Sequence, residues 1–282
     1  MLILYVINPM FKKYDNILVL SGAGFGIDSG LPDFEDMHRI TDQAAQQFNI
    51  EPYIIERPDF YKKNPRIAWG INAYIMDIFL TKKPHSGYFK LKELLQDKNH
   101  FIVTSNIDDH FRDAGFDETK LYEIHGRLNI LQCVNRTCNQ KHNLWPLKEV
   151  PVQENMILKS KIPKCIYCGG DSRPNVCFTD DASYSKKLRD CQKAKYNTWI
   201  KHVANKRKPN LLILEIGCGR HIDSIGVNKL DDGSFRILSK ELAFPTVFNE
   251  SNIKVIRVNP DRNIPKHSWE EVHYKTGVNF FR

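Results

Sequence analysis

The most constraining feature of this sequence is an apolar run that breaks abruptly into a glycine-rich turn. Asn16–Ser21 is followed by Gly22–Gly26, in which three of the five residues are glycine. The apolar run predicts a strand buried on both faces of a sheet. Glycine has no Cβ atom, so the backbone after the strand can turn sharply and approach a ligand closely. If a helix follows the turn, its free N–H groups and the positive end of its dipole favour phosphate.

The turn differs from the dinucleotide fingerprint of ordinary dehydrogenases. That fingerprint has a third glycine where Ile27 stands, followed by a short helix, a second strand and an acidic residue for the ribose. Here the segment Ser29–Phe34, Ser-Gly-Leu-Pro-Asp-Phe, follows instead, and the next clear strand is Phe101–Thr104. The glycines alone leave a purely structural turn open as an alternative. The added segment makes the pattern much more specific.

Further apolar runs alternate with segments of helical periodicity. Buried strands are predicted at Phe101–Thr104, Leu121–Gly126, Arg173–Phe178, Leu211–Ile216 and Lys254–Pro260. Helices are predicted at Tyr53–Leu80, with breaks at Pro58 and Pro65, at Tyr88–Leu95 and at Tyr184–Val203. Strands that alternate with helices and end in Gly, Asn or Asp indicate the α/β class with a doubly wound parallel sheet.

The composition is that of an ordinary globular protein, with 41% hydrophobic and 26% charged residues in a chain of 282. No apolar run approaches the roughly 20 residues that cross a bilayer. The apolar start Met1–Met10 lacks the basic segment of a signal peptide, so we expect it to be buried. The net charge of +8 is spread along the chain, and clusters such as Lys206–Lys208 predict solvated loops. We therefore expect no membrane association and no direct nucleic-acid binding.

Seven cysteines are present, and four of them form the pairs Cys133-x4-Cys138 and Cys165-x2-Cys168. An odd total with two close pairs indicates metal binding in a reducing compartment, here the cytoplasm, rather than a disulfide framework. Four thiolates complete a tetrahedral zinc shell and leave no position for water, which makes such a site structural. Buried free thiols are the alternative. We expect the remaining cysteines to be free: Cys177, Cys191 and Cys218.

Polar residues follow two of the predicted strands. Asn106 and Asp108 come directly after Phe101–Thr104, and open α/β sheets bind ligands at the carboxyl ends of their strands. Taken alone, these two residues are better explained as caps of the next helix. His125 ends the next short strand, and histidine is the side chain most easily set as a base near neutral pH.

The motifs described above, taken in their order along the chain, resemble those of the sirtuin family of NAD-dependent protein deacylases. Gly22–Phe34 is similar to the family's glycine turn and Pro-Asp-Phe element. Three further features are similar to its Thr-Gln-Asn-Ile-Asp, His-Gly and zinc motifs: Thr104-x-Asn106-Ile107-Asp108, His125-Gly126 and the four cysteines. Arg173-Pro174, Phe178, Gly217 and Asn259 fall where the family has Arg-Pro, Phe-Gly-Glu, Gly-Thr-Ser and an asparagine. The likeness covers roughly residues 16–260.

The resemblance implies a Rossmann-like fold with a smaller inserted zinc and helical domain. Residues 1–130 and 173–282 are then the NAD-binding domain, with residues 35–85 as a helical insertion over the cleft. Residues 131–172 are the four-cysteine zinc module. The implied cofactors are NAD and Zn²⁺, and the implied partner is an acyl-lysine protein or peptide. We expect the protein to be a monomer.

The resemblance also implies residue roles. In the family, the acyl-lysine carbonyl oxygen displaces nicotinamide from ribose C1′, a histidine takes a ribose hydroxyl proton, and the acyl group passes to ADP-ribose. Carried over, His125 is the base, Asn106 and Asp108 bind the ribose and the nicotinamide amide, and Phe34 shields the reacting face. The other expected cofactor contacts are Gly22, Ala23, Gly24 and Gly217 at the phosphates, Asn259 at the adenosine end, and Asp33, Ser105, Ile107 and Cys218 within the same motifs.

Several positions depart from the family pattern. Glu35 stands where arginine is usual, and Ser105 replaces glutamine. Thr179-Asp180 replaces Gly-Glu, and Cys218-Gly219-Arg220 replaces Thr-Ser and the residue after it. The last two segments are where the family docks its peptide by strand pairing. Deacylation is the leading hypothesis. An NAD hydrolase or ADP-ribosyltransferase on the same site, and a non-catalytic NAD or ADP-ribose binding module, are the alternatives.

Overall fold

A computed structural model of the chain describes residues 9–178, 180–206, 210–219, 226–229, 235–238, 247–248, 253–262, 268 and 270–281. The predictions for most of Met1–Met10, for Thr179, for Arg207 and Lys208, and for Arg220 lie outside these residues. Within the described part, no helix is both long enough and apolar enough to cross a membrane.

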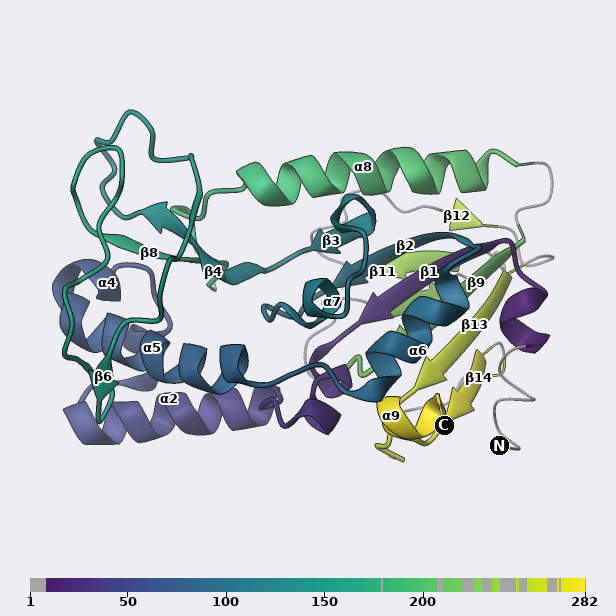
Figure 1. Cartoon of the computed structure of the whole chain (residues 1–282), viewed down its shortest axis with the longest axis horizontal. Helices are drawn as coiled ribbons and strands as arrows, with labels where there is room; N and C mark the ends of the chain where they lie inside the picture. Colours follow the sequence, from purple (N-terminus) through teal and green to yellow (C-terminus); the bar gives the residue numbers. More distant parts are fainter. Residues whose placement is uncertain are drawn as a thin grey trace.

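Six parallel strands form the main sheet, in the order β14-β13-β9-β1-β2-β3 (Figure 1). The strands are β1 (Asn16–Ser21), β2 (Asn99–Thr104), β3 (Leu121–Glu123), β9 (Leu211–Ile216), β13 (Ile253–Val258) and β14 (Glu270–His273). Leu18 in β1 pairs with Phe101 on one side and with Ile213 on the other. The predicted strand after the N-terminal segment is therefore at the centre of the sheet, and the predicted parallel α/β fold is confirmed.

Side chains alternate between two covered faces of this sheet. Ile17 and Val19 belong to a hydrophobic cluster that includes residues of α6 (Ser86–Leu95), α7 (His110–Asp113) and α9 (Gly277–Phe280). Leu18 and Leu20 belong to another that includes residues of α8 (Lys187–Ala204). Every residue of β1 is buried, because helices lie on both faces. This burial explains why the strand is a continuous apolar run.

The strand order places a topological switch at β1 and β9. The chain moves from β1 through β2 to β3 on one side, and from β9 through β13 to β14 on the other. At such a point the connections leave in opposite directions, and a crevice opens outside the carboxyl ends of the strands. The glycine turn follows β1 directly, so this topology places it at the crevice.

A second region lies away from the sheet, at the left of Figure 1. Its helices are α2 (Phe34–Phe48), α3 (Pro52–Ile55), α4 (Phe60–Lys63) and α5 (Pro65–Thr81). Its strands are β4 (Gly126–Cys133), β5 (Trp145–Pro146), β6 (Gln153–Glu154), β7 (Ile157–Leu158) and β8 (Ser172–Val176). Proline at the first position of α3 and of α5 matches the start of each helix, since that position needs no N–H donor.

The helices and the cysteine-containing segment share one hydrophobic cluster. It includes Trp69 and Met76 of α5, Leu131 of β4, and the cysteines Cys133, Cys138 and Cys165. Gly70 brings α5 against the 156–157 backbone, because a Cβ atom at this position would lie 2.1 Å from the carbonyl oxygen of Met156. The helical segment and the cysteine segment are therefore packed together.

Two sequence-based expectations need correction. No α-helix follows the glycine turn directly: two short 3₁₀ turns, Ala23–Phe25 and Ile27–Ser29, intervene before α2 begins. The positive end of a helix dipole is therefore not at the turn.

The buried strand predicted at Arg173–Phe178 exists as β8, but it pairs antiparallel with β4 in a separate sheet. A third sheet contains β10 (Gly226–Lys229), β11 (Phe235–Leu238) and β12 (Val247–Phe248).

Candidate functional site

The glycine turn after β1 is pressed against the end of β9. The N–H of Gly22 donates to Ile216 and the N–H of Gly24 to Gly217, each at 3.0 Å. Gly217 has φ +64°, and a Cβ atom there would lie 2.1 Å from the Phe25 nitrogen. A Cβ atom at Gly22 would lie 2.5 Å from the Gly217 carbonyl oxygen. These glycines are required because two backbones approach each other more closely than side chains allow.

Asn259, directly after β13, joins the same corner. Its Nδ2 donates to the Cys218 carbonyl oxygen at 2.9 Å, and its Oδ1 accepts from the N–H of Asp261 at 2.9 Å. Cys218 follows Gly217 and points its thiol at the Leu20 carbonyl oxygen, 3.4 Å away. Burial raises the pKa of this thiol, so it stays protonated. The expected phosphate and adenosine contacts from three separate strands thus meet at one edge of the sheet.

The segment after β2 is fixed to the end of β1. Thr104 Oγ1 donates to the Ser21 carbonyl oxygen at 3.0 Å, and the N–H of Ser105 donates to the same oxygen at 3.1 Å. Thr104 Oγ1 also accepts from the N–H of Asn106 at 3.0 Å. The next residue, Ile107, accepts from the N–H of Leu128 at 3.1 Å. The backbone of the motif is therefore ordered by its neighbours on both sides.

The side chain of Asn106 is buried without a partner. The residue is 7% exposed, and neither Oδ1 nor Nδ2 has a hydrogen-bond partner among the described residues. An unpaired buried amide costs free energy on the order of 1–3 kcal/mol, so such groups are uncommon in folded proteins. Asn106 therefore presents one donor and one acceptor group suited to a polar ligand. The capping hydrogen bond expected from its side chain to the next helix is not present among the described residues.

Asp108 has the capping role in part. Its Oδ1 accepts from the N–H of His110 at 2.9 Å, at the start of α7. The residue is 6% exposed, and burial raises the pKa of its carboxyl group to about 6. The hydrogen bond from His110 and the more distant Arg112 oppose this rise. The carboxylate is thus costly to ionise, which is a feature of many functional sites.

His125 lies at the turn between β3 and β4 and points its ring at the segment after β2. Its Nδ1 is 3.1 Å from the Ser105 carbonyl oxygen. A carbonyl oxygen only accepts, so Nδ1 carries the proton and Nε2 is the basic nitrogen of the neutral ring. Gly126 has φ +80°, and a Cβ atom there would lie 1.9 Å from the Asn175 carbonyl oxygen. Glycine is therefore needed at position 126 to make the turn that carries His125.

Four cysteine sulfurs form a cluster in the second region. The Sγ atoms of Cys133, Cys138, Cys165 and Cys168 all lie within 4.8 Å of one another. The first three residues are buried and Cys168 is exposed. Four thiols at this separation fit a tetrahedral zinc shell, in which Zn–S bonds are about 2.3 Å long. The predicted pairs are thus brought together as one candidate metal site.

Comparisons with known proteins agree with this geometry. A sequence model of the Sir2 family matches residues 22–201, more than half of the chain. The chain belongs to the Sir2 family. A protein of Leptospira interrogans named NAD-dependent protein deacylase is 30% identical over 177 residues, which are 62% of this chain and 65% of that protein. The mitochondrial sirtuin-5 deacylase of Xenopus tropicalis is 28% identical over 65% of this chain and 62% of its own length. The matches thus span less than two thirds of these relatives.

Solved structures of the Sir2 family share the fold along nearly the whole chain. A Sir2 homologue in complex with NAD has a TM-score of 0.67 at 18% identity, covering 98% of this chain and 91% of that one. A Sir2 protein bound to an acetylated peptide has a TM-score of 0.62 at 17% identity, covering 99% of this chain and 95% of that one. This likeness establishes the Sir2 architecture.

The Pro-Asp-Phe element of this Sir2 chain starts α2. Asp33 accepts from the N–H of Asp36 at 2.9 Å, and Asp36 accepts from the N–H of Asp33 at 3.3 Å, which makes a reciprocal capping box. Phe34 is 43% exposed and packs edge-on against His38. Glu35, which replaces the usual arginine, has the guanidinium of Arg39 3.7 Å away on the same helix. The element thus has a structural role in addition to any contact with a ligand.

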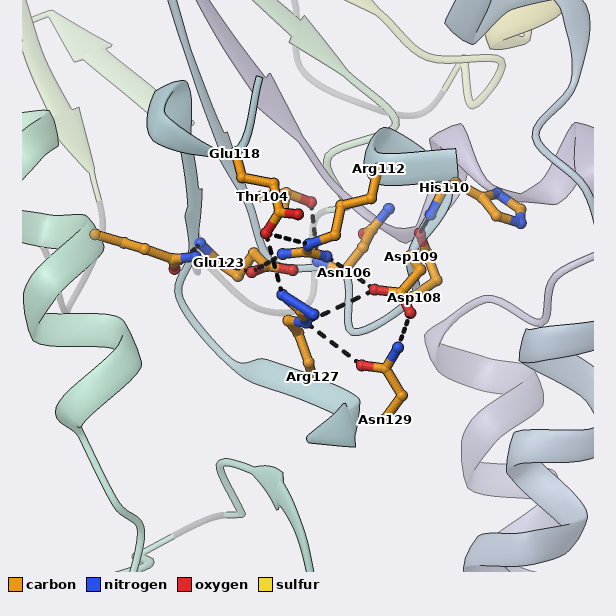
Figure 2. Close-up of polar contacts among 11 residues, drawn as sticks. Thr104, Asn106, Asp108, Asp109, His110, Arg112, Glu118, Glu123, Arg127 and Asn129 are labelled. Atoms are coloured by element: carbon orange, nitrogen blue, oxygen red, sulfur yellow. Dashed lines mark hydrogen bonds and ion pairs between the residues drawn. The ribbon is translucent and has the colours of Figure 1, made fainter. Parts of the chain in front are cut away.

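The sequence reasoning missed a network of charged side chains around Arg112 (Figure 2), two members of which, Glu123 and Arg127, lie two residues from His125 in the sequence. Arg112 of α7 contacts Asp109, Glu118 and Glu123, and Arg127 of β4 lies near the first two of these acids. A signal was present: Glu123 is a charged residue within an otherwise apolar predicted strand, and a buried charge requires a partner. Its partner came from another segment, which the sequence does not identify.

Proposed function

We propose that this protein is an NAD-dependent protein-lysine deacylase that transfers an acyl group to ADP-ribose and releases nicotinamide. The observation that carries this proposal is the unpaired, buried carboxamide of Asn106, next to the buried carboxylate of Asp108 and to Ser105, which binds His125. The deacylase names of several relatives support it.

The crevice at the switch point fits a dinucleotide. Gly22, Gly24 and Gly217 let the ends of β1 and β9 come into backbone contact. Under this proposal the phosphates bind at this turn, at the backbone of these glycines and of Ala23. Asn259 and Cys218 line the same corner, toward the adenosine end. NAD, when bound, supplies the ribose carbon from which nicotinamide leaves and the hydroxyl that receives the acyl group.

The residues around Asn106 fit the reacting end. Asn106 offers its amide as both donor and acceptor, which matches a carboxamide or a ribose hydroxyl. Asp108 would supply negative charge near the ribose, to which the positive charge passes as neutral nicotinamide leaves. Nε2 of His125 accepts a ribose hydroxyl proton, while Ser105 fixes the ring through Nδ1. Ile107, Asp33 and Phe34 complete the proposed lining.

We further propose that the partner is an acyl-lysine protein or peptide. Related structures contain Sir2 proteins bound to acetylated and propionylated peptides. The four cysteines then form a structural zinc module at 131–172, separate from the NAD-binding parts 1–130 and 173–282, and the helices at 35–85 border the cleft. A cytoplasmic location, a monomeric state and an absence of direct nucleic-acid binding stay predictions.

Nicotinamide release, measured with NAD in the presence and absence of an acetyl-lysine peptide, tests the function. We expect release that requires the peptide, and a loss of about 100-fold or more in deacetylation for His125→Ala, because general bases contribute roughly 10²–10⁴-fold. Release without peptide would instead indicate an NAD hydrolase or ADP-ribosyltransferase. Tight NAD binding by calorimetry without any release would indicate a binding module.

A further inference from the structure

The guanidinium of Arg112 joins the two chain segments that build the reacting end of the site. Arg112 lies on α7, four residues after Asp108. One nitrogen contacts Asp109 of its own segment at 2.9 Å, and another contacts Glu123 of β3. A third contact reaches Glu118 at 3.1 Å. Three carboxylates thus surround one cation, as Figure 2 shows.

The central pair of this network is shielded from water. The side chain of Arg112 is 11% exposed and that of Glu123 is 1% exposed. Gln192 of α8 supports the acid, donating to it at 2.9 Å and accepting from the N–H of Glu123 at 3.0 Å. Glu118 is 62% exposed and contributes less, because solvent screens it. The geometry therefore depends mainly on Arg112, Glu123 and Asp109.

The network flanks His125 on both sides along the chain. Glu123 stands two residues before His125, and Arg127 stands two residues after it. Arg127 lies 3.7 Å from Asp109, the same acid that Arg112 contacts. Both ends of the turn that carries His125 are thus attached to the segment that carries Asp108. Two backbone hydrogen bonds also hold the main chain of this turn: the N–H of Ile124 donates to Thr104 at 3.0 Å, and the carbonyl oxygen of His125 accepts from Cys177 at 2.9 Å. The ion pairs add side-chain contacts to these bonds.

We propose that Arg112 is a positioning residue, which holds the His125 turn in register with Asn106 and Asp108. This inference rests on the proposed deacylase function. Arginine suits the role because its planar fork donates to several carboxylates in fixed directions, whereas lysine offers one compact charge. Arg112→Lys therefore keeps the charge and removes the geometry.

Two assays, each reporting one stage of the proposed reaction, distinguish a positioning role of Arg112 from a purely structural one. Exchange of labelled nicotinamide into NAD reports the stage before His125 acts, and deacetylation reports the stage that needs its Nε2. A misplacement of about 1 Å can slow a catalysed step on the order of 100-fold. In Arg112→Lys we expect deacetylation to fall about 100-fold and exchange to fall less than about 5-fold. A purely structural role would lower both rates by the same factor.

A measurement without ligand completes the test. With ¹⁵N-labelled histidine, the spectrum of wild-type protein should show His125 mainly as the Nδ1–H form, assigned by its loss in His125→Gln. Arg112→Lys should shift His125 toward a mixture of tautomers. An unchanged His125 signal together with proportional loss of both rates would overturn the inference. An inactive wild-type protein would instead overturn the proposed function, and the spectrum still tests the positioning.

Two further variants serve as controls. Glu123→Gln keeps the shape and the contact with Gln192 but removes the charge, so it should show the same selective loss, to a smaller degree. This variant decides the question if Arg112→Lys does not fold. Arg257 is equally buried and pairs with Glu215 at 2.7 Å, on β13 rather than beside His125. Arg257→Lys should change exchange and deacetylation by the same factor and leave the His125 spectrum unaltered.

Discussion

Asp108 shows how one residue in this site is held at the expense of stability. Its carboxyl group is buried, and its pKa is raised to about 6 from an ordinary value of 3.8. The folded protein therefore binds this proton more tightly than the unfolded chain does. The stability contributed by this group is complete below about pH 3.8 and is lost as the pH rises through about 6. At neutral pH the buried, ionised carboxylate lowers the free energy of unfolding. A residue with only a structural role has no reason to carry this cost.

Asp108→Asn should therefore stabilise the fold at pH 7 by about 1–3 kcal/mol, since one pKa unit corresponds to about 1.4 kcal/mol. The gain should shrink as the pH falls below about 6 and disappear below about 3.8. Urea unfolding across this pH range measures it, with the exposed Asp42→Asn as the control. The same variant should lose nicotinamide release. A loss of stability at pH 7 would contradict the assignment of Asp108 as a strained functional group.

At the scale of elements, the site depends on how strand ends meet. The ends of β1 and β9 approach each other closely enough that Gly22, Gly24 and Gly217 form backbone contacts in place of side-chain packing. The turn between β3 and β4 makes a comparable approach to β8 at Gly126. These approaches, rather than a helix dipole, shape the strand ends at which the topology predicts a binding crevice.

Gly217→Ala should destabilise the protein by roughly 2–4 kcal/mol, because a left-handed φ and a clash with the Phe25 nitrogen act together. It should also weaken NAD binding, measured by calorimetry, since the turn must move. Gly219→Ala is the matched control: nothing lies within 4 Å of a Cβ atom there. Equal stability of the two variants in thermal unfolding would refute the close approach.

At the scale of the whole molecule, the sheet region, with one hydrophobic cluster on each face, and the second region, with a single cluster, are built differently. The sheet and its covering helices bury alternating faces of β1, whereas the second region combines α2–α5 with three of the four cysteines in one cluster. Metal binding and packing are thereby linked in the second region. The sheet has no cysteine ligand in its clusters among the described residues.

Cys165→Ser should therefore lower zinc content and loosen the second region while the sheet stays protected. Hydrogen exchange should rise in α5 and β4 and change little in β1 and β9, and elemental analysis should show less than one zinc per chain. Cys191→Ser, which alters an exposed cysteine on α8, should change neither quantity. Full zinc occupancy in Cys165→Ser would contradict the four-cysteine site.

Local patterns in the sequence were sufficient for the strands β1, β2 and β9 and for the parallel sheet, since burial on two faces demands continuous apolar runs. They were also sufficient for β13, although Lys254 and Arg257 interrupt its apolar residues. They were sufficient as well for the cysteine pairs and for the glycine turn. The spacing of thiols indicates a metal site, and closely spaced glycines indicate a sharp turn, so each can be recognised from a few neighbouring residues. The placement of β8 in a second sheet could not be predicted from the sequence. An apolar pattern indicates a buried strand but does not indicate which strand it pairs with.

What the sequence determined by itself was which strands are buried in the sheet and which polar groups end them. Only the tertiary structure decided that Asn106 has no partner among the described residues and that Arg112 finds Glu123 across two segments. Such facts depend on distances between residues far apart in the chain. Hydrophobic periodicity sets the faces of an element, but the partners of a buried charge or amide are set by how the elements pack.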